Sequence, residues 1–158
     1  MKRDINLQQL SRDHHHGLLL GWKIRQGLKY LVDPAMIVKY ILHFSEEALF
    51  PHFEEENLIL NYLSDNNTLK QQTLTEHENL KEYIYELSKN SEPGPPELLK
   101  IAEYLDAHIR FEERVLFPFL EKELSAEQLK EMGAAIDTTH TPYVETFEFE
   151  FWNGHVNQ

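Results

Sequence analysis

Apolar residues recur at alternating spacings of three and four along four stretches of the chain. The stretches cover about residues 6–32, 34–63, 68–90 and 96–123. In the first stretch the positions are Leu7, Leu10, His14, Gly17, Gly21, Ile24, Leu28 and Leu31. Such spacing keeps side chains on one face of an α-helix, as in the core-facing stripe of a helical bundle. The pattern therefore predicts four amphipathic helices.

Each of the other three stretches carries a stripe of the same kind. The positions are Met36, Tyr40, His43, Glu47 and Phe50 in the second stretch, Thr73, His77, Leu80, Ile84 and Leu87 in the third, and Leu98, Ile101, Leu105, His108, Glu112, Val115 and Phe119 in the fourth. Every stripe contains one histidine near its middle. The sequence thus places four histidines on the faces that are expected to meet in the core.

Turn-forming residues separate the stretches. Asp33 can cap a helix whose first position is Pro34. Residues 64–67 form a polar turn cluster, and residues 91–96 are rich in proline. Inside the second stretch, Pro51 is expected to kink the helix or to end its regular part.

Long helices joined by short loops favour an all-α fold, an up-down-up-down antiparallel four-helix bundle. The chain of 158 residues is long enough for one domain with a substantial core. We expect the bundle at about residues 6–123 and a C-terminal extension at about 124–158. Ser125 and Gln128 resemble a capping box, which predicts a short helix at the start of the extension.

Composition narrows the classes of function. The formal net charge of −12 argues against a broad basic surface for nucleic acid. The chain contains no cysteine, which excludes thiolate ligands and disulfides. No run approaches the roughly 18 apolar residues of a membrane span, and the first residues turn polar at once, so neither a span nor a secretory signal is expected. A cytoplasmic protein is the expectation.

A glutamate follows two of the stripe histidines at a spacing of four, as the pairs His43/Glu47 and His108/Glu112. Residues four apart on a helix point the same way, so each pair can present an imidazole and a carboxylate to one point. Imidazole is a ligand for iron, zinc and copper, and a carboxylate can bridge two ions. The sequence predicts a two-metal centre, with two histidines, a share in both carboxylates and one open position for each ion. The predicted ligands are His14, His43, Glu47, His77, His108 and Glu112.

Glutamate is abundant in the chain, so the spacing alone selects weakly. A third pair, His52/Glu56, has the same spacing. His52 lies about 180° around a regular helix from His43 and follows Pro51, so this pair is interpreted as facing solvent. The metal-free alternative for the stripe residues is a buried network that shares protons. Because a buried glutamate without a partner is costly, bound cations explain the stripes better.

Four segments carry a resemblance to a known family: Asp13 with His14, HFSEEALFP at 43–51, Glu76 with His77, and HIRFEERVLFP at 108–118. They resemble hemerythrin-like (HHE cation-binding) domains over about residues 7–122. The resemblance implies an antiparallel four-helix bundle around a non-haem di-iron centre. Its cofactor would be two iron ions with an oxo or hydroxo bridge.

One departure bears on the role of the centre. Oxygen-carrying hemerythrins have HxxxH on the third helix and HxxxxD on the fourth, whereas this chain has Thr73 at the first of those positions and Glu112 four residues after His108. The set of four histidines and two glutamates is similar to that of bacterial repair-of-iron-centres proteins. The cysteine-bearing N-terminal domain that such proteins often carry does not appear in this sequence. Neither specific role is therefore implied.

Neighbouring residues offer alternatives to two of the predicted ligands. His15 and His16 adjoin His14, but only His14 keeps the phase of the stripe. Glu113 follows Glu112 and leaves the stripe of its helix. His14 and Glu112 are therefore favoured.

Two glycines and two tyrosines lie close to the predicted ligands along the helices. Gly17 and Gly21 follow His14 by one and two turns, and a helix-interior glycine costs roughly 1 kcal/mol relative to alanine. They are expected either to allow close helix packing or to leave room for a small ligand at the open metal position. Tyr40 and Tyr104, about one turn before two predicted histidines, are candidate hydrogen-bond donors to the ligands or else core aromatics.

The C-terminal residues 143–152 alternate apolar and acidic side chains at the period of a β-strand. This segment is expected to cover one end of the bundle or to mediate a homodimer. His140 and His155 lie outside any stripe and are expected at the surface.

The predicted centre favours a protein that binds or senses a small diatomic ligand, oxygen or nitric oxide, at an open iron position. The sequence supplies metal ligands but no evident substrate pocket or general acid beyond them. The alternatives are a di-iron enzyme that reduces oxygen or peroxide or handles iron, as a ferroxidase or iron donor, and a structural bundle without metal. No nucleic-acid or membrane partner is expected.

Overall fold

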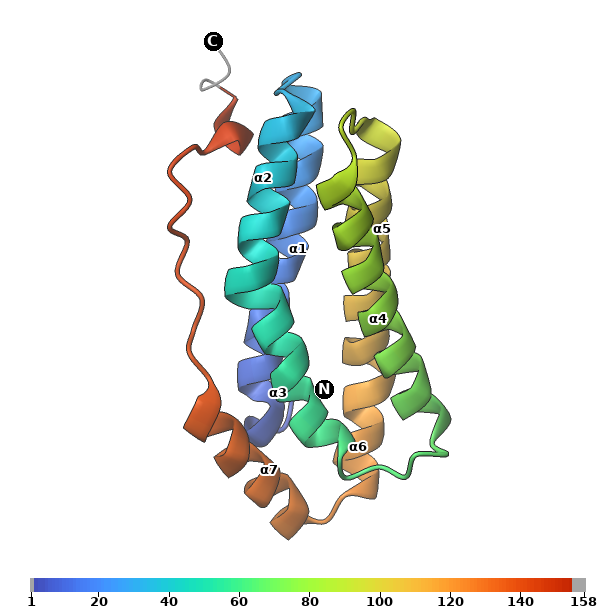
Figure 1. Ribbon diagram of the computed structural model, residues 1–158. Coiled ribbons are helices and arrows are strands. Elements are labelled where there is room, and N and C mark those ends of the chain that lie inside the picture. Colours follow the sequence, from blue (N-terminus) through green and yellow to red (C-terminus); the bar gives the residue numbers. More distant parts are fainter. Residues whose placement is uncertain (1, 155–158) are drawn as a thin grey trace.

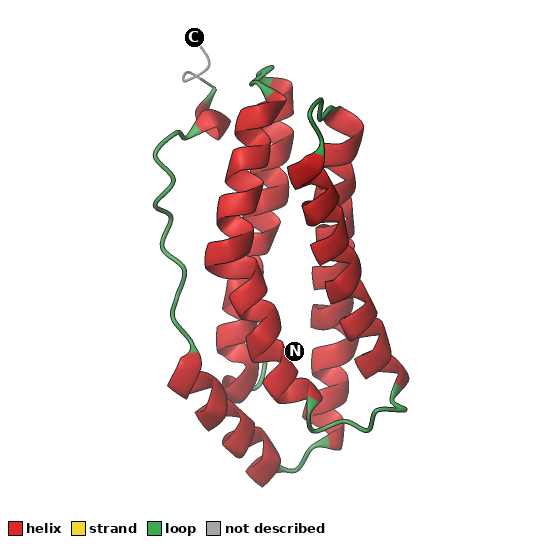
Figure 2. Cartoon of the chain, viewed as in Figure 1, coloured by secondary structure: helices red, strands yellow, loops and turns green. Residues whose placement is uncertain are grey.

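The computed structural model describes residues 2–154. These residues form helices and connecting segments, without a β-strand among them (Figure 2). The all-α prediction is confirmed. None of the helices in this range is long and apolar enough to cross a membrane.

Four helical rods lie side by side in the described part of the chain, and consecutive rods run in opposite directions (Figure 1). The rods are α1 (Gln8–Lys29), α2 (Pro34–Phe44) continued by η2 (Ser45–Leu49) and α3 (Phe50–Leu60), α4 (Thr68–Lys89), and α5 (Pro95–Phe111) continued by η3 (Glu112–Leu116) and α6 (Phe117–Glu123). The rod of α1 packs against those of α2 and α5, and α4 packs against the same two. The molecule is a helical bundle.

Shorter elements close the ends of the bundle. The turn η1 (Ile5–Leu7) precedes α1, α7 (Ala126–Thr139) lies across the end where the chain begins, and η4 (Phe151–Asn153) lies at the opposite end (Figure 1). Ser125 and Gln128 form the predicted capping box of α7.

Two apolar layers fill the bundle, and the middle between them is polar. One layer, which includes Leu20 and Leu105, lies toward the end where α1 meets α2. The other layer, which includes Leu10 and Leu120, lies toward α7. Along α1, His14 falls between the two layers. Polar residues in the middle of a rod are therefore surrounded by apolar packing above and below.

Each of the two proline-containing rods has a π-helical segment directly before its proline. The backbone N–H of Phe50 donates to the carbonyl of Ser45, and that of Phe117 donates to Glu112, both five residues back. Proline removes a backbone donor and crowds the preceding turn, and the wider π turn absorbs that strain without ending the rod. Such segments insert one extra residue into the helical count and often occur at functional sites. The stripe of each rod is displaced by one position beyond them.

Residues 140–150, which we call the strap, run in extended conformation along the α1 and α2 rods (Figure 1). The alternation predicted from the sequence is present, with Tyr143, Glu145 and Phe147 turned toward the bundle, whereas Val144 is 72% exposed. The strap covers the side of the bundle, and α7 covers the end. Of the predicted segment 143–152, residues 143–150 thus lie along the side of the bundle, and Phe151 and Trp152 belong to η4 at one end (Figure 1).

Glu145 is the one acidic side chain of the strap that turns inward, because a buried lysine meets it there. Lys23 of α1 is 8% exposed, and its Nζ donates to Glu145 Oε1 at 2.7 Å. Tyr40 of α2 donates to the same carboxylate, and Tyr143 donates to Oε2 at 2.7 Å. Burial raises the pKa of Glu145, but these donors outweigh it and lower the pKa from 4.5 to about 2.

The stabilisation that Glu145 provides should depend on pH. A folded-state pKa below the unfolded one adds stability that is fully present above about pH 4.5 and declines as the pH falls toward 2. The free energy of unfolding of wild type should therefore exceed that of Glu145→Gln by a constant amount near neutrality, and the difference should shrink between pH 4.5 and pH 3. Urea denaturation followed by tryptophan fluorescence measures it. A difference that stays constant down to pH 3 would contradict this role.

Candidate metal centre

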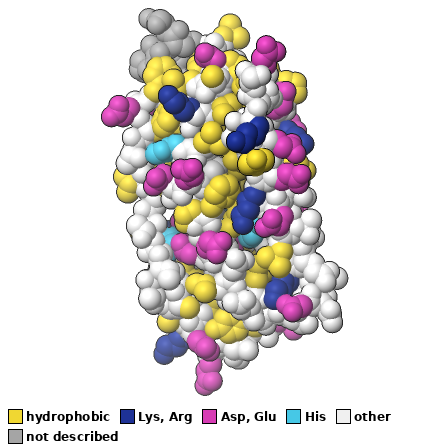
Figure 3. Space-filling view, viewed as in Figure 1, with side chains coloured by type: hydrophobic (Ala, Val, Ile, Leu, Met, Phe, Trp, Pro, Cys, Tyr) yellow, Lys and Arg dark blue, Asp and Glu magenta, His cyan; other side chains and the backbone are white. Residues whose placement is uncertain are grey.

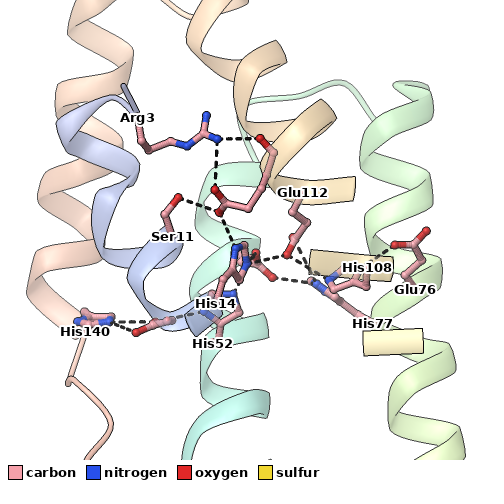
Figure 4. A network of polar contacts seen from close by, with 12 residues as sticks. Arg3, Ser11, His14, His52, Glu76, His77, His108, Glu112 and His140 are labelled. Carbon is pink, nitrogen blue, oxygen red and sulfur yellow. Dashed lines mark hydrogen bonds and ion pairs between the residues drawn. The ribbon is translucent and has the colours of Figure 1, made fainter. Parts of the chain in front are cut away.

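Six buried polar residues meet between the two apolar layers (Figure 4). They are His14 of α1, His52 and Glu56 of α3, His77 of α4, His108 of α5, and Glu112 at the start of η3. All four rods contribute at least one of them. Glu56 and Glu112 are 0% exposed, so their carboxylates need compensating cations or donors inside the protein.

The six residues form two overlapping groups of potential ligands. One group is His14, His52, Glu56 and Glu112, and the other is Glu56, His77, His108 and Glu112. Within each group the ligand atoms lie within 4.8 Å of one another. Both carboxylates belong to both groups. Two metal ions can thus be held, each by two imidazoles and a share in two carboxylates.

Glu56 lies between histidines of three rods. Its Oε1 is 2.9 Å from Nε2 of His77, and its Oε2 is 3.2 Å from Nε2 of His52. The Nε2 of His14 lies 3.7 Å from Oε2. The carboxylate therefore has imidazoles from both groups on its two oxygens, which is the arrangement of a bridging ligand.

Glu112 lies between the same groups from the opposite rod. Its Oε1 is 3.1 Å from Nε2 of His14 and 3.2 Å from Nε2 of His108. Nε2 of His77 is 3.9 Å from Oε2. Glu112 thus also contacts imidazoles of both groups.

Several of these contacts do not satisfy hydrogen-bonding geometry. Four buried atoms of the centre lack a hydrogen-bond partner: Nε2 of His52, Nε2 of His108, Oε2 of Glu56 and Oε2 of Glu112. Buried polar atoms are nearly always paired in native proteins. Unpaired nitrogen and oxygen atoms that converge on one point fit metal ligation better than a closed network of shared protons.

Three of the four histidines have their outer ring nitrogen bonded to a further carboxylate. The partners are Glu113 at 2.6 Å from Nδ1 of His14, Glu76 at 2.7 Å from Nδ1 of His108, and Asp13 at 3.2 Å from Nδ1 of His52. Such bonds fix the ring orientation and leave Nε2 free to ligate a metal. Metal-binding histidines commonly have such a carboxylate bonded to the ring nitrogen that does not ligate the metal.

Burial and neighbouring charges shift the pKa values of the histidines and glutamates in opposite directions. Burial lowers the pKa of His52, but the charge of Glu56 and the bond to Asp13 outweigh it and raise the pKa to about 9. Burial is likewise outweighed at His108, chiefly by Glu112, and its pKa rises to about 10. Burial raises the pKa of Glu56, yet the charge of His52 and the surrounding bonds hold it well below its usual range. The raised pKa values of His52 and His108 favour their protonated forms in the metal-free protein, and metal binding would require the loss of those protons.

Four of the six residues predicted from the sequence lie in this cluster, namely His14, His77, His108 and Glu112. His43 and Glu47 do not. The ring of His43 lies 5.3 Å from that of Phe147 in the strap, and Glu47 is exposed. The structure brings His52 and Glu56 to the position where these two were expected.

The interpretation of His52 and Glu56 as a solvent-facing pair is wrong, because they are only 7% and 0% exposed. The cause is that the second rod has two apolar faces. The stripe through Tyr40 and His43 packs under the strap, and the face that enters the bundle is a different one. Its members are Ile37, Ile41, Phe44, Leu49, Phe53, Glu56 and Leu60.

A signal for the correct pair is present in the sequence. The bundle-facing stripe keeps spacings of three and four except for one spacing of five, between Phe44 and Leu49. That interruption coincides with the π segment before Pro51. If one extra residue is allowed before Pro51, the stripe continues to His52 and Glu56. On the fourth rod the same displacement makes Leu116 buried and leaves Val115 43% exposed.

The structure also shows where the alternatives to His14 and Glu112 lie. His15 is exposed and His16 half-buried, and neither belongs to the cluster. Glu113 stands behind His14 rather than between the two groups. Thr73 is buried and donates to the carbonyl of Leu69, four residues back on α4.

The two glycines have different surroundings. A Cβ at Gly17 would lie 2.7 Å from Cδ1 of Ile109, and Gly17 also lines the cavity beside the centre. A Cβ at Gly21 would meet Arg25 and Asp106 at 3.0 Å. Gly17 thus fits both expected roles, whereas Gly21 serves close packing of α1 on α5.

The remaining predicted residues lie away from the ligands. Tyr40 bonds to Glu145 of the strap, and the hydroxyl of Tyr104 accepts a bond from Asn79. His140, expected at the surface, is half-buried, and its Nε2 lies 3.0 Å from each oxygen of Asp13. His155 falls outside the described residues.

A small cavity adjoins the centre. His14, His52, His108 and Glu112 line it together with apolar side chains such as Ile109. Its volume is about 40 Å³, which suits a ligand of a few atoms.

Comparisons with models of known protein families, with curated proteins and with solved structures found no match. The chemistry of the centre therefore follows from its own residues. Two overlapping buried His/Glu groups can hold metal ions in this helical bundle.

The carboxylate behind His108 should strengthen metal binding without deciding the number of ions. We expect Glu76→Gln to lower metal affinity by about 10–100-fold, the usual effect of losing such a partner, because the neutral amide no longer holds the imidazole by a charged bond. Competition with a chromophoric chelator measures the affinity. Glu78→Gln is the matched control, since Glu78 lies two residues away and is exposed. Equal affinities for both variants would contradict a supporting role for Glu76.

Proposed function

We propose that the protein is a hemerythrin-like non-haem di-iron protein that binds or senses a small diatomic ligand, oxygen or nitric oxide. The observation that carries the proposal is the pair of buried groups that share both Glu56 and Glu112. Two ions that shared both carboxylates would lie side by side. A mononuclear site would leave two of the four histidines without a role.

The donor set is compatible with iron, the ion that the family resemblance implies. Four imidazole nitrogens and two carboxylates suit iron, zinc or manganese better than the soft ions that prefer thiolates. The candidate ligands are His14, His52, Glu56, His77, His108 and Glu112. They keep the composition of four histidines and two glutamates that the sequence predicts. When bound, a ferrous pair supplies redox-active Lewis-acid ions with room for an external ligand.

The protein's own residues favour a small neutral ligand. The cavity beside the centre is small and partly apolar, with Phe44, Leu105 and Ile109 in its wall. These apolar side chains offer van der Waals contact to a small neutral ligand beside the polar residues of the centre. On the visible face of the molecule, acidic side chains outnumber basic ones and no basic band crosses it (Figure 3). Nothing on this face resembles a site for a polyanion.

The proposal is tested by metal analysis of the natively expressed protein, followed by its optical spectrum during anaerobic addition of nitric oxide and, separately, of oxygen. Two irons per chain and a stable, reversible spectral change with either gas are expected. Rapid turnover of oxygen to peroxide or water would favour the enzyme alternative. Fewer than one iron per chain, or no spectral change with either gas, would overturn the proposal.

A further inference from the structure

The wall of the cavity includes two residues of the strap. Thr141 and Tyr143 line the cavity together with His14 and Glu112 of the centre. Tyr143 also lines two hollows on the outer side, one shared with His16 and the other with Glu47. One side chain therefore borders both the interior space at the centre and the outer surface on either side of the strap.

Tyr143 is held in this position by ring contacts and by one hydrogen bond. Its ring meets that of Phe44 at 5.3 Å and that of His16 at 5.4 Å, both edge to face. Its hydroxyl donates to Glu145 Oε2 at 2.7 Å. Glu145 is in turn held by Lys23 of α1. Tyr143 is thus joined to the bundle through a charged latch two residues further along the strap.

The strap is also fastened before Tyr143. Nε2 of His140 lies 3.0 Å from both oxygens of Asp13 on α1. Between these two polar attachments, residues 141 and 142 are exposed and the backbone is extended. Exposed residues of this kind open locally at low free-energy cost, whereas Tyr143 and Phe147 of the strap pack against the core of the bundle. Release of the latch can move Tyr143 without unfolding the four rods.

The chemistry around the cavity mouth selects by charge as well as by size. Asp13, Glu47 and Glu55 line the cavity or the adjoining hollow. Oε2 of Glu55 is buried without a hydrogen-bond partner. Three carboxylates at a mouth repel anions and leave neutral molecules unaffected.

We propose that Tyr143 is the gate of the cavity: its ring limits entry to neutral ligands of diatomic size, and the Glu145–Lys23 latch keeps it closed. This inference rests on the proposed function, because the gated ligand is the one that reaches the metal centre. Tyr143 acts on access and specificity and touches no metal ligand by a hydrogen bond in the described structure. Closure of this kind controls the rate of ligand entry more than the strength of binding.

The first test compares two neutral ligands of ferrous iron that differ in size, nitric oxide and nitrosobenzene. Stopped-flow spectroscopy measures their association with the iron-loaded wild type, Tyr143→Ala and the control Val144→Ala. We expect Tyr143→Ala to bind nitric oxide about tenfold faster, a change within the usual span for variants of one site, and to admit nitrosobenzene, which the wild type excludes. Val144→Ala should match the wild type, because Val144 points outward.

Iron content, measured first, separates the possible failures. Tyr143→Ala that holds two irons and keeps the wild-type rates and selectivity would overturn the gate alone. A wild type that holds no metal would overturn the proposed function and the gate with it.

A second test examines the Glu145–Lys23 latch in the metal-free protein. Limited chymotrypsin digestion of the metal-free protein reports cleavage at the aromatic residues of the strap, by mass spectrometry of the products. Glu145→Gln should be cleaved severalfold faster than the wild type, whereas the exposed control Glu148→Gln should not differ from it. Equal cleavage of all three proteins would overturn the latch, even if Tyr143→Ala fails to fold.

Discussion

Replacing Glu56 with alanine is expected to lower the metal bound per chain from two ions to fewer than one. Glu56 belongs to both ligand groups and contacts histidines of each. Its loss therefore removes a ligand from both ions and leaves the charges of two ions with only one carboxylate between them. Inductively coupled plasma mass spectrometry on protein loaded with iron without oxygen measures the content.

Glu47→Ala is the matched control for this substitution. Both glutamates lie four residues after a histidine on the same rod, but Glu47 is exposed and outside the cluster. The control should keep two ions. Retention of two ions by Glu56→Ala would exclude its bridging role, and loss of metal in Glu47→Ala alone would restore the ligand pair predicted from the sequence.

Removal of metal is expected to lower the melting temperature by roughly 10–20 °C. A ligand at 100 times its dissociation constant stabilises the folded state by about 2.7 kcal/mol per site, and two sites act together here. For a chain of this length each kcal/mol shifts the melting temperature by about 2–4 °C. The shift is favoured by the position of the centre, because the buried carboxylates of Glu56 and Glu112 need compensating cations or donors inside the protein.

Differential scanning calorimetry of the metal-free and loaded protein measures this shift. Glu56→Ala provides the control, because its melting temperature should respond to metal much less than that of the wild type. A wild-type melting temperature that is independent of metal would show that the cluster is only a polar network. Such a result would also remove the basis of the proposed function.

The fold was largely predictable because three rods have a single apolar face. In α4 every stripe position from Thr73 to Leu87 is buried, and in α1 the stripe is buried from Leu7 to Ile24. The spacing of these positions reports directly which side meets the bundle. His14 and His77 are buried on these stripes, as their spacing predicts.

The same reasoning fails for the second rod, because a segment distant in the sequence packs against one of its apolar faces. Tyr40 and His43 are part of a stripe, but the partner of that stripe is the strap, about a hundred residues further along the chain. Periodicity identifies an apolar face and does not name what covers it. The choice between His43/Glu47 and His52/Glu56 therefore depended on a tertiary contact.

The π segments account for the displacement of the buried stripe beyond Pro51 and Pro118. Counting by three and four assumes an unbroken α-helix, whereas one residue is added before Pro51 and another before Pro118. The count fails only beyond the insertion: His108 and Glu112 are buried as the stripe predicts, whereas Val115 is 43% exposed. Proline within a long amphipathic stretch was the visible sign of the insertion.

Hydrophobic periodicity also does not predict the carboxylates that bond the outer ring nitrogens of the histidines. Asp13, Glu76 and Glu113 each lie directly beside a cluster residue in the sequence, yet each bonds a histidine of a different rod. Adjacent positions on a helix point about 100° apart, so such a side chain turns toward the neighbouring rod. Only the packing of the rods shows which ring it reaches.

We propose that Glu56 and Glu112 lie between two metal ions inside the bundle. Anomalous diffraction at the iron absorption edge, from crystals of the iron-loaded protein, tests it most directly. Two anomalous peaks are predicted, one among His14, His52 and the two carboxylates, the other among His77, His108 and the same carboxylates. A single peak, no peak in the bundle, or a peak beside His43 and Glu47 would contradict it.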